Sequence, residues 1–329
     1  MMRLKPLLWI VFVCAGVHPA LAQEIVFASV QDAETILSTS DSYSKSMSTF
    51  DRAVRMRVRH DPTEKEYLAF AASAATAWPD DERGAVEAAY RDIQAQIARL
   101  ELPLPARIYL IRTSGREDSH AAYTRQNAIV LPIRMLKTMT GQALRRLVAH
   151  ELFHVATRAH PQLVDPLYAA VGYQRCGEVP LPANLQSRKI TNPDAPKNEH
   201  CIRVALSGET VWALPVLVAT ATRDEILAEG GFLGYVNVIL LLVDLPQRGV
   251  VARPLPSSKG VEVVGIQDVK GFFEQTGHNT QYIIHPEEIV SDNFALLALG
   301  MRDVPSPQIL TAIEKVLANY AARVPEPAH

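Results

Sequence analysis

The amino-acid sequence predicts an α+β fold with a helical N-terminal part. Helical periodicity dominates residues 30–100, short runs of β-forming residues follow between residues 105 and 265, and two helical patterns close the chain after residue 285. The chain has 329 residues, which is enough for one large domain or two modest ones. We therefore expect a helical region over 23–104 and a mixed domain over 105–329, with a β-hairpin insertion at about 172–265.

The first 22 residues have the composition of a secretory signal peptide. Arg3 and Lys5 form a positive start, an apolar stretch follows, and Ala20-Leu21-Ala22 supplies the small residues that a signal peptidase needs. We expect cleavage after Ala22 and a periplasmic or secreted mature protein. An uncleaved anchor is disfavoured because the apolar stretch is too short for a span, and a lipid attached at Cys14 is disfavoured by bulky Val13.

Composition excludes several other classes of protein. The formal net charge is −2, and no run of Lys or Arg marks a nucleic-acid surface. The longest apolar run of the mature chain, Val238–Val243, is far too short to cross a bilayer, so we expect no stable membrane insertion. Cys176 and Cys201 remain after signal removal and predict a disulfide in an oxidising compartment, with two separate buried thiols as the alternative.

The N-terminal helical pattern is clearest just before residue 100. Apolar side chains recur there at the spacing of one helix face, at Val86, Tyr90, Ile93, Ile97 and Leu100. We expect Asp80 or Asp81 to cap this helix, because a carboxylate can accept hydrogen bonds from the first free amides. Pro103 and Pro105 should end it.

Short β-type runs fill the middle of the chain. The predicted strands are Ile108–Ile111, Ala121–Leu131, Ile202–Leu206, Val211–Val218, Tyr235–Leu245 and Val261–Gly265. The third and fourth flank a short turn, which predicts a hairpin. Pro, Asn and Ser are frequent over 172–200, so we expect a long surface loop there, with turn chemistry at Lys189–Asp194. Asp268–Gln275 predicts a short helix.

Three stronger helical patterns remain. Thr140–Arg158 has a wide apolar face and is followed by Pro161. Residues 286–299 begin with Pro286, a favoured first helical residue, and Ser306-Pro307 opens a last helix that runs to about Ala322.

The first of these helices contains the pattern H-E-x-x-H. His150 and His154 are four residues apart, so both imidazoles lie on one helix face and can reach one Zn²⁺. Glu151 then leans toward the open side of the metal, where a carboxylate can take a proton from water and pass it to a leaving amine. The pattern predicts a zinc-dependent hydrolase.

A catalytic zinc usually has three protein ligands, and two residues compete for the third place. His160 stands ten residues after His150, the spacing of the metzincin pattern. That pattern has a glycine where this chain has Thr157, a β-branched residue poorly suited to positive φ. Glu288 is the favoured candidate, because Asp292 lies four residues further on the predicted helix and can accept a hydrogen bond from a liganding histidine such as His150.

The combination of His150-Glu151-x-x-His154 with Glu288-x-x-x-Asp292 resembles the gluzincins, the thermolysin-like metallopeptidases, and also a group of uncharacterised exported bacterial proteins. The resemblance covers residues 140–158 and 285–299 and implies a zincin-like fold. It also implies Tyr and His donors beside the metal for the oxyanion. Tyr282 is our first choice, with His285 and His278 as the other candidates.

The predicted function is hydrolysis of peptide bonds in a peptide or protein substrate. Ala121–Leu131 precedes the metal helix, and we expect it to bind extended substrates as an edge strand, although an internal strand is the alternative. A non-catalytic zinc-bearing protein that captures envelope peptides is the rival function, and a cell-wall amidase is a third. Glu151 favours catalysis, because a binding site needs the histidines but not this carboxylate.

Overall fold

The described residues form both helices and strands, which confirms the α+β prediction. The computed structural model describes residues 23–229, 231–245, 249–257 and 260–323. The predicted signal peptide, residues 1–22, lies outside the described residues. Within the described residues, no helix is both long and apolar enough to cross a membrane.

The first sheet has four strands in the order β1-β2-β4-β3. Strands β1 (Glu24–Phe27), β2 (Arg107–Thr113) and β4 (Ala128–Pro132) are parallel, and β3 (Tyr123–Arg125) pairs antiparallel with β4. Because β1 pairs with β2, the N-terminal region shares a sheet with the segment that follows residue 105. Strand β3 lies at the edge of this sheet.

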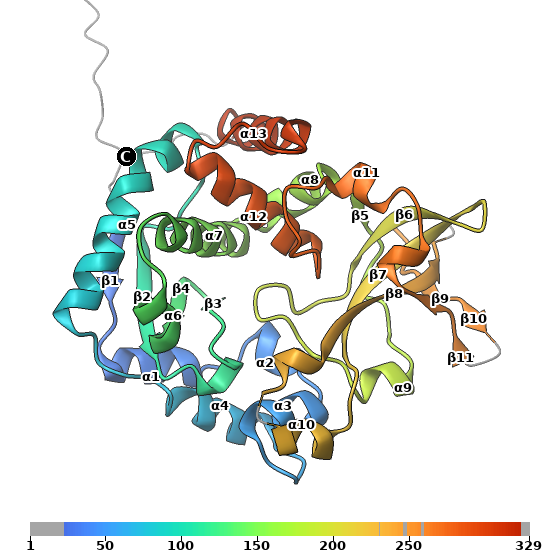
Figure 1. The fold of residues 1–329 in the computed structure, drawn as a ribbon, viewed down its shortest axis with the longest axis horizontal. Coiled ribbons are helices and arrows are strands. Elements are labelled where there is room, and N and C mark those ends of the chain that lie inside the picture. The colour runs from blue at the N-terminus through green and yellow to red at the C-terminus, as the bar shows by residue number, and fades with distance from the viewer. Residues whose placement is uncertain (1–22, 230, 246–248, 258–259, 324–329) are drawn as a thin grey trace, which may run out of the picture.

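Alternating side chains cover both faces of this sheet. Ile108 and Leu110 pack into the main core with α5 (Asp80–Arg99) and α7 (Gly141–Ala159). Ile111 and Val130 point to the other face, where they pack with α1 (Val30–Ser38), and α4 (Glu64–Ala72) lies on the same side. Figure 1 shows α7 on one side of the strands and α1 and α4 on the other.

The second sheet is antiparallel, in the order β12-β8-β7-β6-β5, with β9 also paired to β8. Its strands are β5 (Tyr173–Arg175), β6 (His200–Leu206), β7 (Glu209–Ala219), β8 (Val236–Asp244), β9 (Arg253–Pro254) and β12 (Val263–Val264). Strands β6 and β7 form the predicted hairpin. The Cys176–Cys201 disulfide is present and lies in a small core on one face of this sheet, which confirms that prediction.

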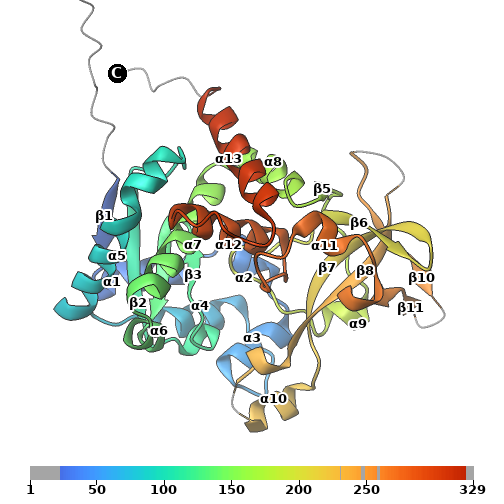
Figure 2. The same ribbon diagram turned by 45° about the horizontal axis from the view of Figure 1, so that its top comes forward.

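Two helices far apart in the chain lie side by side in the main core. They are α7 and α12 (Pro286–Ala298), and α13 (Pro307–Ala321) packs beside α12 (Figure 2). The predicted helix limits are confirmed to within about two residues at each end. Pro286 is the first residue of α12, and the amide of Glu287 donates to the His285 side chain, which caps the helix.

The remaining elements are short. They are α2 (Ser42–Ser46), α3 (Thr49–Met56), α6 (Ile133–Thr138), α8 (Val164–Ala169), α9 (Ala183–Gln186), α10 (Arg223–Glu229), α11 (Phe272–Thr276), the 3₁₀ turns η1 (Arg116–Asp118), η2 (Pro161–Leu163), η3 (Leu233–Tyr235) and η4 (Ile266–Asp268), and strands β10 (Pro256–Ser257) and β11 (Gly260–Val261). The helix predicted at 268–275 thus begins only at Phe272, and the strand predicted at 261–265 is divided between β11 and β12.

Three local predictions are wrong. Residues 121–131 are not one strand but the β3–β4 hairpin, because Gln126 adopts a left-handed φ of 52° and turns the chain. Neither Asp80 nor Asp81 caps α5; Pro79 is the N-cap, and both carboxylates lie in the first turn, where the helix dipole favours them. The segment 172–200 is not only a surface loop, because residues 190–192 are buried.

Candidate metal centre

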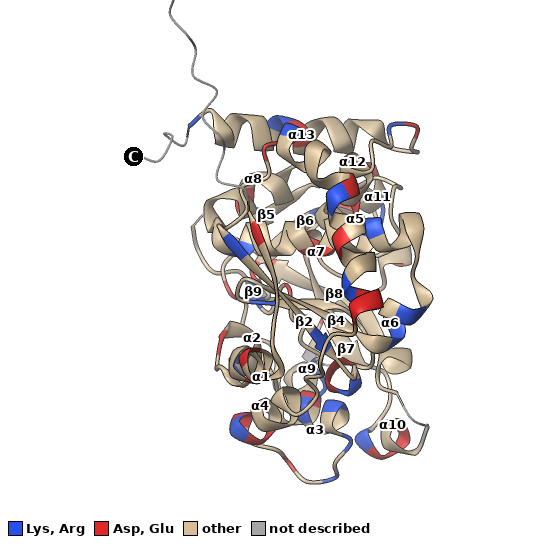
Figure 3. Ribbon diagram, turned by 90° about the vertical axis from the view of Figure 1, so that its left-hand side faces the viewer, with Lys and Arg blue, Asp and Glu red and all other residues tan. Residues whose placement is uncertain are grey.

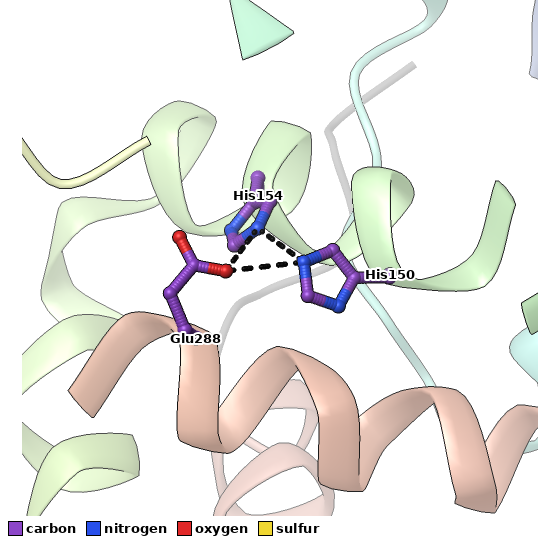
Figure 4. A group of neighbouring side chains, drawn as sticks. All are labelled: His150, His154 and Glu288. Carbon is purple, nitrogen blue, oxygen red and sulfur yellow. Dashed lines mark hydrogen bonds and ion pairs between the residues drawn. The ribbon is translucent and has the colours of Figure 1, made fainter. Parts of the chain in front are cut away.

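Three side chains from two helices converge on one point. Nε2 of His150 lies 3.0 Å from Nε2 of His154 and 3.1 Å from Oε2 of Glu288, and the distance from His154 Nε2 to the same oxygen is 3.5 Å. Helix α7 supplies both histidines one turn apart, and α12 supplies the carboxylate across from them (Figure 4). All three residues are buried or nearly so.

A carboxylate lies behind each imidazole. Nδ1 of His150 is 3.1 Å from Oδ1 of Asp292, and Nδ1 of His154 is 2.9 Å from Oε1 of Glu287. An ionised carboxylate only accepts hydrogen bonds, so each Nδ1 carries the proton that it donates. This leaves the Nε2 lone pair of each ring directed at the shared point.

The donor set fits a zinc ion. Without a proton on either Nε2, two imidazole lone pairs and a carboxylate oxygen that face one another within 3.5 Å repel, whereas a cation between them is attracted to all three. In a tetrahedral zinc site, bonds of roughly 2.0–2.1 Å place neighbouring ligand atoms about 3.3 Å apart, which is close to the observed separations. Two nitrogens and one oxygen are also a ligand set that zinc accepts.

Charges around this point favour a cation. Burial lowers the pKa of His150, but its hydrogen bonds to Asp292 and Glu288 outweigh burial and raise that pKa to about 9. A proton on Nε2 therefore occupies this point when no metal does, and a bound metal would replace it. Burial raises the pKa of Glu288, but His154 and His150 hold it well below the usual value. Three carboxylates therefore surround two imidazoles, a surplus of negative charge that a divalent ion would neutralise.

Glu151 lies beside the histidines with one oxygen unused. The residue is only 3% exposed, and Oε2 is buried with no hydrogen-bond partner among the described residues. Burial, with a smaller contribution from Asp194, raises the pKa of this carboxyl to about 8. An unpaired buried oxygen costs free energy, so the position suits a group that must exchange a proton with a bound molecule.

A cavity of about 330 Å³ opens directly on this cluster, and we call it the metal-facing cavity. His150, Glu151 and Glu288 form part of its wall. The rest of the lining is mostly apolar and comes from Ala121, Ala122, Met135, Met139, Ala143 and Leu147, together with Arg146, Asp194, Tyr282 and Asp292. A cavity with apolar walls and a few converging polar groups is typical of a substrate site.

Residues of the disulfide loop reach this site, which the sequence analysis did not predict. The side-chain amide of Asn192 donates to Oε1 of Glu288 at 2.7 Å. Asp194 accepts from the backbone amide of Thr124 at 2.9 Å and forms an ion pair with Arg158. Turn chemistry in the sequence indicates that this loop is ordered but contains no signal of what it contacts.

Glu287 also has a role that sequence reasoning missed. Its Oε1 accepts from the Thr157 hydroxyl at 2.6 Å as well as from His154, and its Oε2 accepts from Tyr168 at 2.7 Å. In the sequence, only the adjacency of Glu287 to Glu288 on α12 could have indicated that Glu287 contacts the site. Thr157, which stands where the metzincin pattern has glycine, is used here to hold the carboxylate that orients His154.

The other predicted residues are placed as follows. His160 ends α7, where its Nδ1 bonds to the Tyr320 hydroxyl at 3.0 Å, and it does not join the three-residue cluster. His278 stacks on Phe273. His285 caps α12 through Nδ1 and does not line the metal-facing cavity. Tyr282 does line this cavity, is half-exposed, and has its ring centre 6.3 Å from that of His150.

Strand β3 does lie at a sheet edge next to α7, but part of that edge is already hydrogen-bonded within the protein. The amide of Thr124 points away from β4 and donates to Asp194. Ala121 and Ala122, just before the strand, line the cavity. The accessible stretch of edge is therefore the approach to β3 rather than its centre.

Comparisons of the chain with protein-family models, with curated proteins and with solved structures give no match.

Proposed function

We propose that this chain is an exported zinc-dependent metallopeptidase with a zincin-like fold of the gluzincin type. The observation that carries the proposal is the convergence of His150, His154 and Glu288 on one point, with a carboxylate behind each imidazole. Glu151, with its unpaired buried oxygen, adds a proton acceptor next to that point. A site that only bound metal would not need this fourth group.

Each residue has a distinct part in the reaction. Zinc bound there would supply a Lewis acid for the peptide carbonyl and lower the pKa of water. Glu151 would accept a proton from water at Oε2, which has no other partner among the described residues, and deliver it to the leaving amine. Asp292 and Glu287 keep the two Nε2 atoms directed at the site.

The oxyanion of the reaction requires a hydrogen-bond donor from the cavity wall. Tyr282 is the candidate, because its side chain is 45% exposed and lines the metal-facing cavity. Nδ1 of His285 is occupied by the amide of Glu287, so His285 is better suited to holding the start of α12. A peptide would lie along Ala121 and Ala122, with an apolar side chain in the cavity near Met139 and Leu147.

One set of variants tests this proposal. Zinc content and cleavage of a peptide library are measured for the parent protein, Glu151→Gln, Glu288→Ala and the matched control His160→Ala. We expect Glu151→Gln to keep about one zinc per chain and lose activity by at least about 100-fold, because only the proton acceptor is removed. Glu288→Ala should lose zinc, and His160→Ala should keep both zinc and activity.

Other outcomes select other functions. A zinc-loaded parent that cleaves no peptide would indicate a binding protein, and cleavage confined to cell-wall peptides would indicate an amidase. Loss of zinc in His160→Ala but not in Glu288→Ala would contradict the ligand set and move the protein toward the metzincins.

A further inference from the structure

A second cavity, of about 440 Å³, is lined by basic side chains. Arg57, at the end of α3, Arg116, in η1, Arg134, in α6, and His120 all contribute to its wall. No carboxylate is among the described residues that line it. Figure 3 shows acidic and basic segments mixed along α5, in contrast to the cavity wall, whose described charged residues are all basic.

The positive charge of this cavity is only partly neutralised within the described structure. Arg55, which also lines it, is buried and paired with Asp51 and Asp118. The guanidinium of Arg116 donates to the backbone and hydroxyl oxygens of Ser73 and has no carboxylate partner. In the described ranges, Arg134 makes no side-chain hydrogen bond or ion pair. Two exposed guanidinium groups are therefore available for an anion.

A third cavity links the positions of the basic cavity and the metal-facing cavity, because it has lining residues in common with each. Its volume is about 200 Å³. It shares Arg55 and Leu233 with the basic cavity, and it shares Ala121, Ala122, Asp194 and Tyr282 with the metal-facing one. The three cavities thus adjoin one another in series from the basic groups to the proposed zinc, and we call this series the track.

Exposed apolar side chains lie along the same track. The described residues include four strongly exposed large hydrophobic side chains, and two of them, Leu233 at 46% and Tyr282 at 45%, line the middle cavity. Exposed apolar groups between a charged pocket and a reaction site fit a chain molecule that touches both, because the apolar groups contact its middle. A free phosphate ion would use the arginines and leave the rest of the track without a role.

The geometry points to a substrate class: peptides that carry a carboxylate, as an acidic side chain or a chain terminus, several residues from the bond to be cut. Arg116 and Arg134 bind that carboxylate in the basic cavity while the peptide passes Leu233 and Tyr282 to the metal centre. This inference rests on the proposed peptidase function for the cleavage step, but the binding preference itself requires no cleavage.

Binding is therefore measured on the zinc-loaded Glu151→Gln protein, with labelled alanine-rich nonapeptides that have a central leucine. One peptide carries two glutamates at its C-terminal end and its partner carries two glutamines there; a second pair has them at the N-terminal end. In one of the two pairs, the glutamate peptide should bind at least about tenfold more tightly at low salt. Adding Arg116→Gln and Arg134→Gln should abolish the difference. Arg91→Gln with Arg99→Gln, on exposed positions of α5, removes the same charge and should preserve it.

Equal affinity of glutamate and glutamine peptides in both pairs would overturn the inference, as would a preference that survives Arg116→Gln with Arg134→Gln. Inorganic phosphate that displaces the label at the concentration at which the unlabelled glutamate peptide does so would also overturn it, because the site would then recognise a free anion. Failure of the parent to cleave any peptide would leave these binding results unchanged, so the two proposals fail separately.

Discussion

Glu287 and Asp292 make the same kind of contact with the two histidines but differ in burial. Glu287 is 1% exposed and its oxygens accept three hydrogen bonds, from His154, Thr157 and Tyr168. Asp292 has a 15% exposed side chain and is also paired with Arg146. The more deeply buried carboxylate has no water to replace a lost partner, so substitutions there should have the larger effect.

We expect Glu287→Gln to weaken zinc binding by roughly 10- to 100-fold. The amide nitrogen that replaces one carboxylate oxygen cannot accept a hydrogen bond, so His154 would no longer be held in its orientation. Asp292→Asn should weaken zinc binding less. Competition with a chromophoric chelator measures both. Glu82→Gln is the matched control, since Glu82 is a buried carboxylate paired with Arg112 outside the site. Unchanged zinc affinity in Glu287→Gln would contradict the role given to this residue.

At the scale of elements, the helices that carry the site were predictable and the loop that completes it was not. Helix α7 has a wide apolar stripe and α12 opens with Pro286, and these are local signals. The bond from Asn192 to Glu288 joins residues 96 positions apart in the chain, and no local pattern encodes such a contact. The β3–β4 turn was missed because Gln126, in place of the usual Asn or Gly, adopts the left-handed conformation.

The disulfide closes the loop that supplies Asn192 and Asp194. Replacing Cys176 and Cys201 by alanine should lower the free energy of unfolding by about 3 kcal/mol, because the unfolded chain regains the freedom of a loop with its ends 25 positions apart. Urea unfolding measures this, and the reduced parent protein should match the variant.

Zinc affinity should stay near the parent value in this variant. Thr191 is held independently, since its amide donates to Asp51 at 2.8 Å and its carbonyl accepts from Arg55 at 2.8 Å. A loss of zinc affinity as large as that expected for Glu287→Gln would show that the disulfide, and not these buried charges, positions the loop.

At the scale of the whole molecule, the N-terminal helices are part of the structure that supports the site. Strand β1 completes the first sheet, and Arg55 of α3 links Asp118 of η1 to the loop before Asn192. Helical periodicity predicted these helices but not this integration, because buried charges such as Asp51 and Arg55 read as surface residues in the sequence.

This buried polar layer should make stability depend on pH. Burial raises the pKa of Glu117 to about 7, although the hydrogen bond from the Thr113 hydroxyl lowers this pKa. Oε2 of Glu117 has no hydrogen-bond partner in the described structure. The folded protein therefore holds this proton more tightly than the unfolded chain. The associated stability is fully present below pH 4.5, the usual pKa of a glutamate side chain, and is lost as the pH rises toward about 7.

Glu117→Gln removes this titration, so the variant should gain stability relative to the parent by up to about 3 kcal/mol between pH 4.5 and pH 8. Any constant penalty from the buried amide cancels when the difference between the two proteins is followed across pH by urea unfolding. Glu87→Gln, on the exposed face of α5, loses the same charge and is the matched control. If the free energy of unfolding of Glu117→Gln runs parallel to that of the parent across pH, the Glu117 carboxyl titrates alike in the folded and unfolded chains. The interior beside Arg55 and Asp118 is then more hydrated than its burial indicates.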